Sequence, residues 1–150
     1  PTDAWQDNWG EPMVYALLDR LLLEGYALRD VDPNRVYLMG YSMGGGHSTT
    51  IGFGHPELFA AVGGFSGYSN TQSAVTARLL ADPAKTNSDY KMIFIGSGTE
   101  DAAVNGGRAL HTAFTEKGIK HLWSEDPGYG HDYQIWRIYV RDLLPKLFKE

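Results

Sequence analysis

The chain has 150 residues, of which 43% are hydrophobic and 21% charged, and this composition is typical of one globular domain. Its net charge of −5 and its lack of Lys/Arg clusters interleaved with aromatic residues argue against a nucleic-acid partner. The apolar runs have the length of strands, so no membrane-spanning helix is expected, and the absence of cysteine excludes disulfides, thiolate-bound zinc and a cysteine nucleophile.

The first part of the chain predicts a loop, a helix and a turn. Residues 1–10 carry two tryptophans without a clear period, which is typical of a loop that packs through its aromatic side chains. Apolar residues then recur at helical spacing over residues 11–25, and Gly25 is a typical helix stop. Residues 30–34, DVDPN, consist mainly of turn-forming residues.

The central motif follows a short apolar run. Residues 36–39 predict a strand buried on both faces, and the next five residues, Gly40 to Gly44, have the G-x-S-x-G pattern of a nucleophile elbow. Such a turn has no room for side chains at its first and last positions, and it holds its serine on a strained backbone with the hydroxyl exposed. Residues 44–54, which are rich in small side chains, predict the helix that should follow the elbow.

Ser42 is therefore the first candidate nucleophile. A helix that begins near Met43 would point unpaired N–H groups and its positive dipole end at an oxyanion beside Ser42, so the Met43 N–H is a candidate oxyanion donor. The alternative interpretation is a glycine-rich turn with an incidental serine. A strand before the motif and a helix after it favour the elbow.

The rest of the chain alternates between strand and helix patterns. Buried strands are predicted over 60–65, 92–95 and 121–124, and helices over 104–117 and 132–149, the first stopped by Gly118 and the second kinked by Pro145. Residues 68–89 are polar with one short helical stretch over 74–80, and they form either an insertion above the site or a solvated connector. This order predicts an α/β fold with a doubly wound, mostly parallel sheet.

A serine hydroxyl needs a base to accept its proton, and histidine is the usual base. Four of the five histidines have better structural or surface explanations, because they lie in or beside predicted helices and strands: His47, His55, His111 and His121. His131 lies in a glycine-rich loop after the last strand, where it can reach the carboxyl edge of the sheet. We expect His131 to be the base.

The third member should be a carboxylate that orients the base. Glu100 and Asp101 end the loop after the third strand, and Glu125 and Asp126 end the fourth. We choose Asp101, which gives the chain order Ser, Asp, His found in α/β-hydrolases.

Three segments carry a family resemblance: GYSMGGGHSTTIGFGHPELFAAVGGFSG, GTEDAAVNGGRALHTAF and GYGHDYQIWRIYVRDLLPKLF. Together they resemble esterases of the esterase D type, which are α/β-hydrolases, and especially the feruloyl and acetyl-xylan esterases of carbohydrate esterase family 1. The resemblance implies that Ser42 is the nucleophile, Asp101 the triad acid and His131 the base, with one oxyanion N–H from Met43. Family members often have glutamine in place of His47, to which we assign no catalytic role.

The resemblance runs from about residue 11 onward and matches the carboxyl-terminal half of the family fold. The family has further strands and a second oxyanion donor before the helix that corresponds to residues 11–25. We therefore expect residues 1–150 to be a single, partial esterase domain. We also expect the missing half in another chain or in a longer parent, where it would cover the open edge of the first strand.

The resemblance implies hydrolysis of carboxylic esters, with feruloyl or acetyl esters on plant cell-wall polysaccharide as substrates, and it favours a secreted or periplasmic location. Four aromatic residues are candidates for substrate binding: Tyr41, Tyr68, Tyr129 and Trp136. For Trp136 we favour the alternative role of core packing. No cofactor is expected, and the histidine spacing indicates no metal site. Alternatives are a siderophore or short-chain acyl esterase, a dienelactone-hydrolase-like or peptidase-like enzyme, and a non-catalytic binding or scaffold domain.

Overall fold

The computed structural model describes Pro12, Ala16, Arg20 and residues 32–147. The predicted loop over 1–10 and the helix predicted over 11–25, apart from those three positions, lie outside the described residues. None of the helices in the described part is both long and apolar enough to cross a membrane.

The described core is a sheet of four parallel strands in the order β1-β2-β3-β4. The strands are β1 (Tyr37–Tyr41), β2 (Ala61–Phe65), β3 (Met92–Gly98) and β4 (Leu122–Asp126). Each connection between successive strands contains a helix, as parallel pairing requires. The predicted parallel α/β fold is confirmed.

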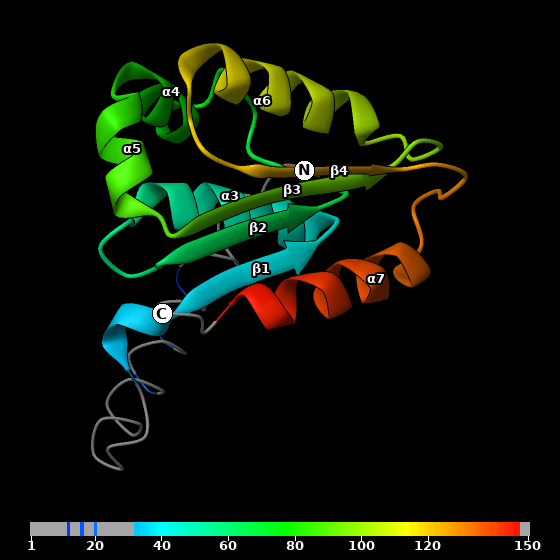
Figure 1. Ribbon diagram of the computed structural model, residues 1–150, viewed down its shortest axis with the longest axis horizontal. Coiled ribbons are helices and arrows are strands. Elements are labelled where there is room, and N and C mark those ends of the chain that lie inside the picture. The colour runs from blue at the N-terminus through cyan, green and yellow to red at the C-terminus, as the bar shows by residue number, and fades with distance from the viewer. Residues whose placement is uncertain (1–11, 13–15, 17–19, 21–31, 148–150) are drawn as a thin grey trace.

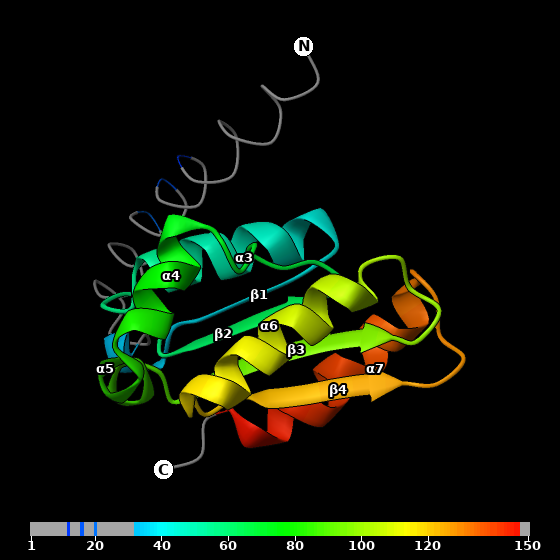
Figure 2. The same cartoon turned by 90° about the horizontal axis from the view of Figure 1, so that it is seen from above.

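Helices cover both faces of this sheet (Figures 1 and 2). One face carries α3 (Met43–Gly54), α4 (Ala74–Ala81) and α6 (Val104–Lys117), and α5 (Pro83–Asp89) lies near the amino ends of the strands. The other face carries α7 (Tyr133–Leu143), and short 3₁₀ turns occupy Pro33–Arg35 (η1) and Leu144–Lys146 (η2).

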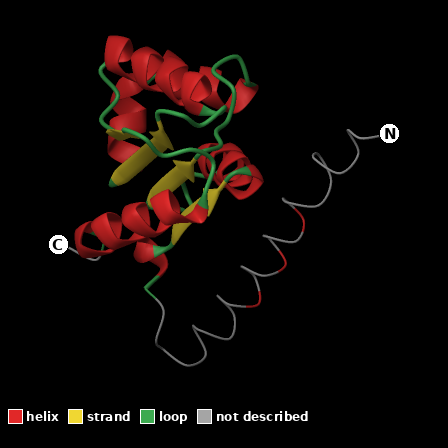
Figure 3. Ribbon diagram, turned by 90° about the vertical axis from the view of Figure 1, so that its right-hand side faces the viewer, coloured by secondary structure: helices red, strands yellow, loops and turns green. Residues whose placement is uncertain are grey.

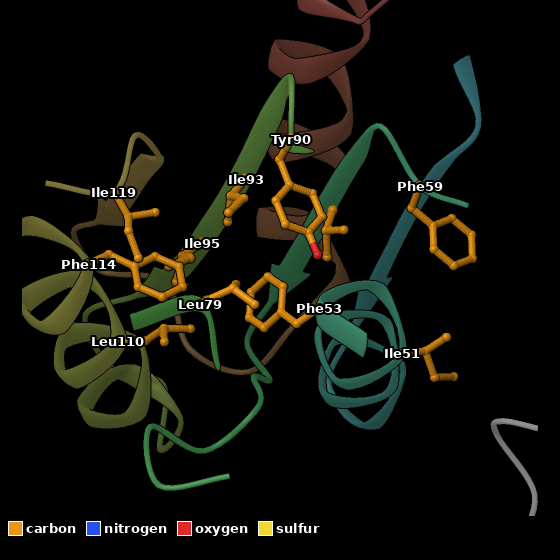
Figure 4. Close-up of a cluster of buried hydrophobic side chains, with 11 residues drawn as sticks. Ile51, Phe53, Phe59, Leu79, Tyr90, Ile93, Ile95, Leu110, Phe114 and Ile119 are labelled. Carbon is orange, nitrogen blue, oxygen red and sulfur yellow. The ribbon is translucent and has the colours of Figure 1, made fainter. Parts of the chain in front are cut away.

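Two apolar clusters hold these layers together. Between the sheet and α3, α4 and α6, Phe53, Leu79 and Phe114 pack with Ile93 and Ile95 of β3 (Figure 4). On the opposite face, buried residues of α7 pack on the aromatic side chains of β2 and β3: Phe65, Phe94, Ile135, Tyr139 and Leu143. Because β2 has strands on both sides and helices on both faces, all five of its residues are buried.

Most predicted elements are confirmed, with small shifts at their ends. Gly118 ends α6 in the left-handed conformation with φ 70°, as its predicted role as a helix stop requires. The last helix does not run on with a kink, because α7 ends at Leu143 and the turn containing Pro145 is 3₁₀.

Two further predictions about these elements were wrong. The strand before the elbow is half-buried along its whole length, not buried on both faces, because β1 is the edge of the described sheet. The polar segment over 68–89 also contains a second helix, α5, which starts with Pro83 and is capped by the Asp82 carboxylate accepting from the Lys85 N–H at 3.0 Å.

Candidate active site

The turn between β1 and α3 has the backbone strain expected of an elbow. Ser42 lies there at φ 56° and ψ −123°, a conformation that residues with a side chain rarely adopt. Two hydrogen bonds hold it in place, since the Ser42 N–H donates to the Phe65 carbonyl at 2.8 Å and the Ser42 carbonyl accepts from the Gly46 N–H at 3.0 Å. The turn is therefore anchored both to β2 and to the first turn of α3.

The glycines of the elbow differ from the prediction. A side chain at Gly40 would collide with the Gly44 backbone, as expected, but a Cβ at Gly44 would meet nothing within 4 Å. The crowded position is Gly45, whose Cβ would lie 2.6 Å from the Gly67 carbonyl oxygen and 2.9 Å from that of Gly40. The need for a glycine thus falls one residue after the motif, where α3 passes closest to the end of β2.

Three side chains predicted from the sequence meet at the carboxyl edge of the sheet. The Ser42 Oγ lies 2.8 Å from Nε2 of His131, and Nδ1 of the same ring lies 3.0 and 3.1 Å from the two carboxylate oxygens of Asp101. Figure 3 looks onto this edge, where the connecting loops lie in front of the strands.

The protons in this chain of hydrogen bonds follow from its geometry. An ionised carboxylate can only accept, so Nδ1 of His131 carries a proton and donates it to Asp101. In the neutral ring, Nε2 then has a free lone pair, and the Ser42 hydroxyl donates to it. This is the arrangement in which a histidine can take a proton from serine.

Burial separates the roles of these groups. The Asp101 side chain is fully buried, whereas 44% of the His131 side chain is exposed, so solvent or a ligand can reach the ring but not the carboxylate. Burial raises the pKa of Asp101, but the nearby Ser66 hydroxyl, the Ala103 N–H and His131 outweigh it, and the net pKa lies below its ordinary value. The Ala103 N–H donates to Asp101 Oδ1 at 2.8 Å. Asp101 therefore stays ionised at neutral pH.

The first residue of α3 is Met43, which directly follows Ser42. Backbone N–H groups in the first turn of a helix have no carbonyl partner within that helix, and they carry its positive dipole end. The site thus combines a hydroxyl, a base, a buried carboxylate and a helix N-terminus. Acyl transfer through serine uses these same parts.

Comparison with known proteins agrees with this geometry. A family model described as "Putative esterase" matches residues 2–148, which is nearly the whole chain. The chain belongs to this esterase family.

Solved structures with the same fold have several esterase activities. An S-formylglutathione hydrolase from Staphylococcus aureus is 14% identical with a TM-score of 0.72, over 98% of this chain and 65% of that one. A ferulic acid esterase from Anaeromyces mucronatus is 18% identical with a TM-score of 0.68, over 89% and 53%. An enterochelin esterase from Shigella flexneri is 21% identical with a TM-score of 0.66, over 90% and 36%. These likenesses show the α/β-hydrolase fold, and the chain spans less than two thirds of each of these relatives.

In this esterase-family chain, the aromatic residues named from the sequence lie in different surroundings. The Tyr41 ring packs beside the His131 ring, with centroids 4.9 Å apart. Burial raises the pKa of Tyr41, and the charges of Asp101 and Asp132 add to the effect. Tyr68 packs against Gly64 and Gly107, and its hydroxyl donates to the Gly96 carbonyl. Tyr68 thus ties the loop after β2 to β3.

The other two aromatic residues lie on or beside α7. Trp136 is not in the core: it is 40% exposed and lines an apolar hollow beside β1, together with Met39 and Val140. Tyr129 is half-buried in the loop that carries His131, and its carbonyl accepts from the Glu100 N–H at 3.0 Å. That bond ties the loop after β3 to the loop after β4.

The remaining histidines and carboxylates of this esterase-family chain make contacts away from Ser42. His111 and His121 lie 2.8 Å apart, Nδ1 to Nε2, and the His111 ring stacks on Trp123. His55 contacts Glu57 at 2.9 Å and Glu125 pairs with Arg108, while His47 lies within α3.

The sequence placed the end of β2 beside the elbow, but it did not predict the supporting roles of two residues there, Ser66 and Gly67. Ser66 follows β2 with φ 54°, and a side chain at Gly67 would collide with the Ser42 carbonyl. Ser66 directs its hydroxyl towards the Asp101 region, although it makes no hydrogen bond of standard geometry there. The signal in the sequence was the pair of small residues, Ser66 and Gly67, at the end of a predicted strand. This pair indicates where the two residues lie but not which backbone conformation they adopt.

Proposed function

We propose that this protein is a serine esterase that hydrolyses carboxylic esters through an acyl-enzyme at Ser42. One observation carries the proposal: the continuous hydrogen-bond chain from the Ser42 hydroxyl through His131 to the buried Asp101 carboxylate. Membership of the esterase family supports the same reaction.

The reaction would proceed in two halves. Ser42 Oγ attacks the ester carbonyl carbon while His131 Nε2 takes the hydroxyl proton, and the oxyanion that forms is stabilised near the Met43 N–H. The intermediate then expels the alcohol, which leaves with the proton from His131. Water attacks the acyl-enzyme while His131 takes one of its protons, and the acid leaves as Ser42 regains its hydrogen.

A complete oxyanion site needs a second donor, and removal of one donor typically costs about 10²–10³ in rate. In the family that this chain resembles, that donor comes from the loop after the third strand, before the helix that corresponds to residues 11–25. We therefore include in the proposal that the second donor comes from outside residues 32–147, in this polypeptide or in another chain.

The substrate class follows from the resemblance and remains part of the proposal. Feruloyl or acetyl esters on plant cell-wall polysaccharide are the first candidates, and the likeness to a ferulic acid esterase supports them. The likeness to an enterochelin esterase and an S-formylglutathione hydrolase equally favours substrates with another alcohol or thiol as the leaving group, cleaved by the same serine mechanism. A non-catalytic binding domain of this fold is the rival from another class.

A fluorophosphonate probe tests the proposal directly, because it reacts much faster with an activated serine than with ordinary hydroxyl groups. We expect covalent labelling at Ser42, lost in Ser42→Ala and in His131→Ala. The matched control is Ser88→Ala, which removes an exposed hydroxyl on α5 and should label like the parent. Absence of labelling in a folded protein would favour the binding domain.

Substrate class is a separate measurement. Release rates from methyl ferulate, p-nitrophenyl acetate and a peptide amide distinguish a feruloyl esterase, a short-chain acyl esterase and a peptidase. A protein that labels at Ser42 but cleaves only the amide would overturn the ester assignment while leaving the serine chemistry intact.

A further inference from the structure

An open pocket of about 480 Å³ lies along one side of α7, beside the loop that carries His131. We call it the α7 groove. It is lined by two tyrosines, two arginines, an amide and one aliphatic side chain: Tyr129, Tyr133, Gln134, Arg137, Ile138 and Arg141. This lining is distinct from the hydrogen-bond chain at Ser42 and from the apolar hollow at Trp136.

The charge of the groove opposes that of the chain. The whole sequence has a net charge of −5, yet the lining has two arginines and no carboxylate. Arg141 contacts the neighbouring Asp142 at 2.7 Å, while Arg137 makes no ion pair with any residue in the described part of the chain. Arg141 lies in the last turn of α7, where a positive charge interacts favourably with the negative end of the helix dipole. This interaction does not account for the positive charge of Arg137, which lies in the middle of the helix.

The two arginines are four residues apart, so they lie one above the other on the same side of α7. A guanidinium group donates two parallel hydrogen bonds, which match the two oxygens of a carboxylate. An arginine with no ion-pair partner, beside a second one, is therefore suited to bind an anion that arrives with a ligand.

The tyrosines indicate what accompanies that anion. Tyr133 is 61% exposed, which is unusual for a large aromatic side chain beside a hollow and is typical of a binding surface. A tyrosine presents an apolar ring face together with a polar tip, so it can pack against a ring that has both C–H and hydroxyl groups. Gln134 adds further hydrogen-bonding groups. A sugar ring has both of the required properties.

The groove is close enough to the site to hold part of the same substrate. Tyr129 and Tyr133 are each two residues from His131, so their Cα atoms lie within about 7.6 Å of that of His131. The carboxyl carbon of the acid being released is bonded to Ser42 Oγ in the acyl-enzyme. An anion in the groove must therefore be a different group of the substrate, and the sugar ring that the tyrosines favour is the alcohol portion of an ester.

We infer that the α7 groove binds a carboxylate on the alcohol portion of the ester, as found in an acidic sugar. This inference rests on the proposed esterase function and narrows its substrate class. The arginines bind the carboxylate, the tyrosines pack on the sugar ring, and the ester bond reaches Ser42 and His131.

The test compares two esters with the same acyl group, one on a neutral hexose and one on a hexuronic acid. In the full chain, the double variant Arg137→Gln/Arg141→Gln should lower kcat/KM for the hexuronate ester about tenfold, because two charge-assisted contacts are lost. The value for the neutral ester should stay within about twofold. Added salt should also reduce the preference of the parent protein for the hexuronate ester over the neutral ester, because salt screens the attraction between the arginines and the carboxylate.

The matched control is Lys117→Gln/Lys120→Gln, which makes the same change in net charge at two exposed positions, the last residue of α6 and the loop before β4, towards the amino ends of the strands. It should leave the ratio of the two kcat/KM values unchanged. An equal effect of both double variants, or no effect of the arginine variant, overturns the inference. The inference is also overturned if the arginine substitutions lower kcat/KM for an ester that carries its carboxylate on the acyl group instead of on the sugar.

A binding measurement separates this inference from the proposed function. Ser42→Ala cannot form an acyl-enzyme, and NMR titration of this variant with free hexuronic acid should shift signals of Tyr129 and Tyr133. Adding the two arginine substitutions should weaken that binding. A protein that fails to label with fluorophosphonate refutes the esterase proposal, whereas one that labels at Ser42 but shows no arginine-dependent binding refutes the groove alone.

Discussion

The carboxylate behind the histidine gives the sharpest prediction. Asp101→Asn preserves the size of the side chain and removes its charge. The Ala103 N–H, which donates to Oδ1 at 2.8 Å, should fix the new amide with its oxygen at that position and its NH₂ at the position of Oδ2. Both carboxylate oxygens lie almost equally far from Nδ1, at 3.0 and 3.1 Å, so the NH₂ would face the ring.

An amide donor facing Nδ1 selects the wrong form of His131. The ring would accept at Nδ1 and carry its proton on Nε2, 2.8 Å from Ser42 Oγ, where it could no longer take the hydroxyl proton. The ion pair with the imidazolium formed during the reaction would also be lost. Such a change of tautomer with preserved geometry costs about 10⁴ in kcat. We therefore expect kcat to fall by about 10³–10⁴ with little change in KM.

The assay is hydrolysis of p-nitrophenyl acetate at pH 7, combined with the rate of fluorophosphonate labelling. The matched control is Glu100→Gln, which makes the same chemical change at the exposed neighbour and should retain activity within about threefold. Urea unfolding establishes that both variants are folded. If Asp101→Asn kept more than a tenth of the parent's activity in a folded protein, the assigned role of Asp101 would be wrong.

Three further predictions concern stability. Gly45→Ala should lower the free energy of unfolding by about 1–3 kcal/mol, because its Cβ would press on two backbone carbonyls. Gly44→Ala, where a Cβ meets nothing, should be neutral or raise the free energy of unfolding by up to about 1 kcal/mol. Urea denaturation of the two variants measures the difference. Asp132→Ala should cost about 1 kcal/mol by the same measurement, since its carboxylate accepts from two N–H groups at the start of α7, and Asp132→Asn should restore most of it. The folded-state pKa of Asp101 lies below its ordinary value, so the stability that its charge contributes is present above the ordinary carboxyl pKa of about 4 and is lost as the pH falls through the folded-state pKa. The difference in unfolding free energy between the parent and Asp101→Asn should therefore shrink as the pH is lowered below about 4, and a constant difference would contradict this.

Local patterns were sufficient to predict most of the fold. Apolar runs predicted the four strands, and glycine and proline signals predicted where α3 and α6 end, because these signals depend on neighbours in the sequence. The end of α7 at Leu143 was not predicted, since Pro145 was interpreted as a kink within a longer helix. The meeting of Ser42 with His131, and of His131 with Asp101, was predictable for a related reason. Parallel strands bring their carboxyl ends to one edge, so reactive residues that follow strands are expected to meet there.

What could not be predicted depends on neighbours in space. Gly44 and Gly45 look alike in the sequence, and a side chain at Gly45 is costly because the Gly67 and Gly40 carbonyls lie close to it in the folded chain. The half-burial of β1 depends on what lies on its far side, and its own residues are as apolar as those of a central strand. In α5, the capping signal of Asp82 and Pro83 was present, but the helix is polar and has no apolar period to reveal it.

The strand register explains why the three reactive groups are separated so unevenly in sequence. Tyr41, Phe65, Gly96 and Ser124 are paired in one row across the four strands. Ser42 directly follows Tyr41 of this row. Asp101 comes five residues after Gly96, and His131 comes seven residues after Ser124. Strands lie about 4.8 Å apart, so β4 begins its loop about 14 Å from β1, and seven residues can span up to about 23 Å.

The loops must therefore lengthen with distance from the elbow if their side chains are to return to it. The loop after β4 travels farthest, and its return is fixed by two bonds to the loop after β3: the Thr99 hydroxyl accepts from the Gly128 N–H at 3.0 Å, and the Tyr129 carbonyl accepts from the Glu100 N–H at 3.0 Å. The same contacts place His131 against Asp101, which ends the shorter loop. The acid and the base are thus positioned as a unit, and the elbow needs to provide only the strained backbone that presents Ser42 to them.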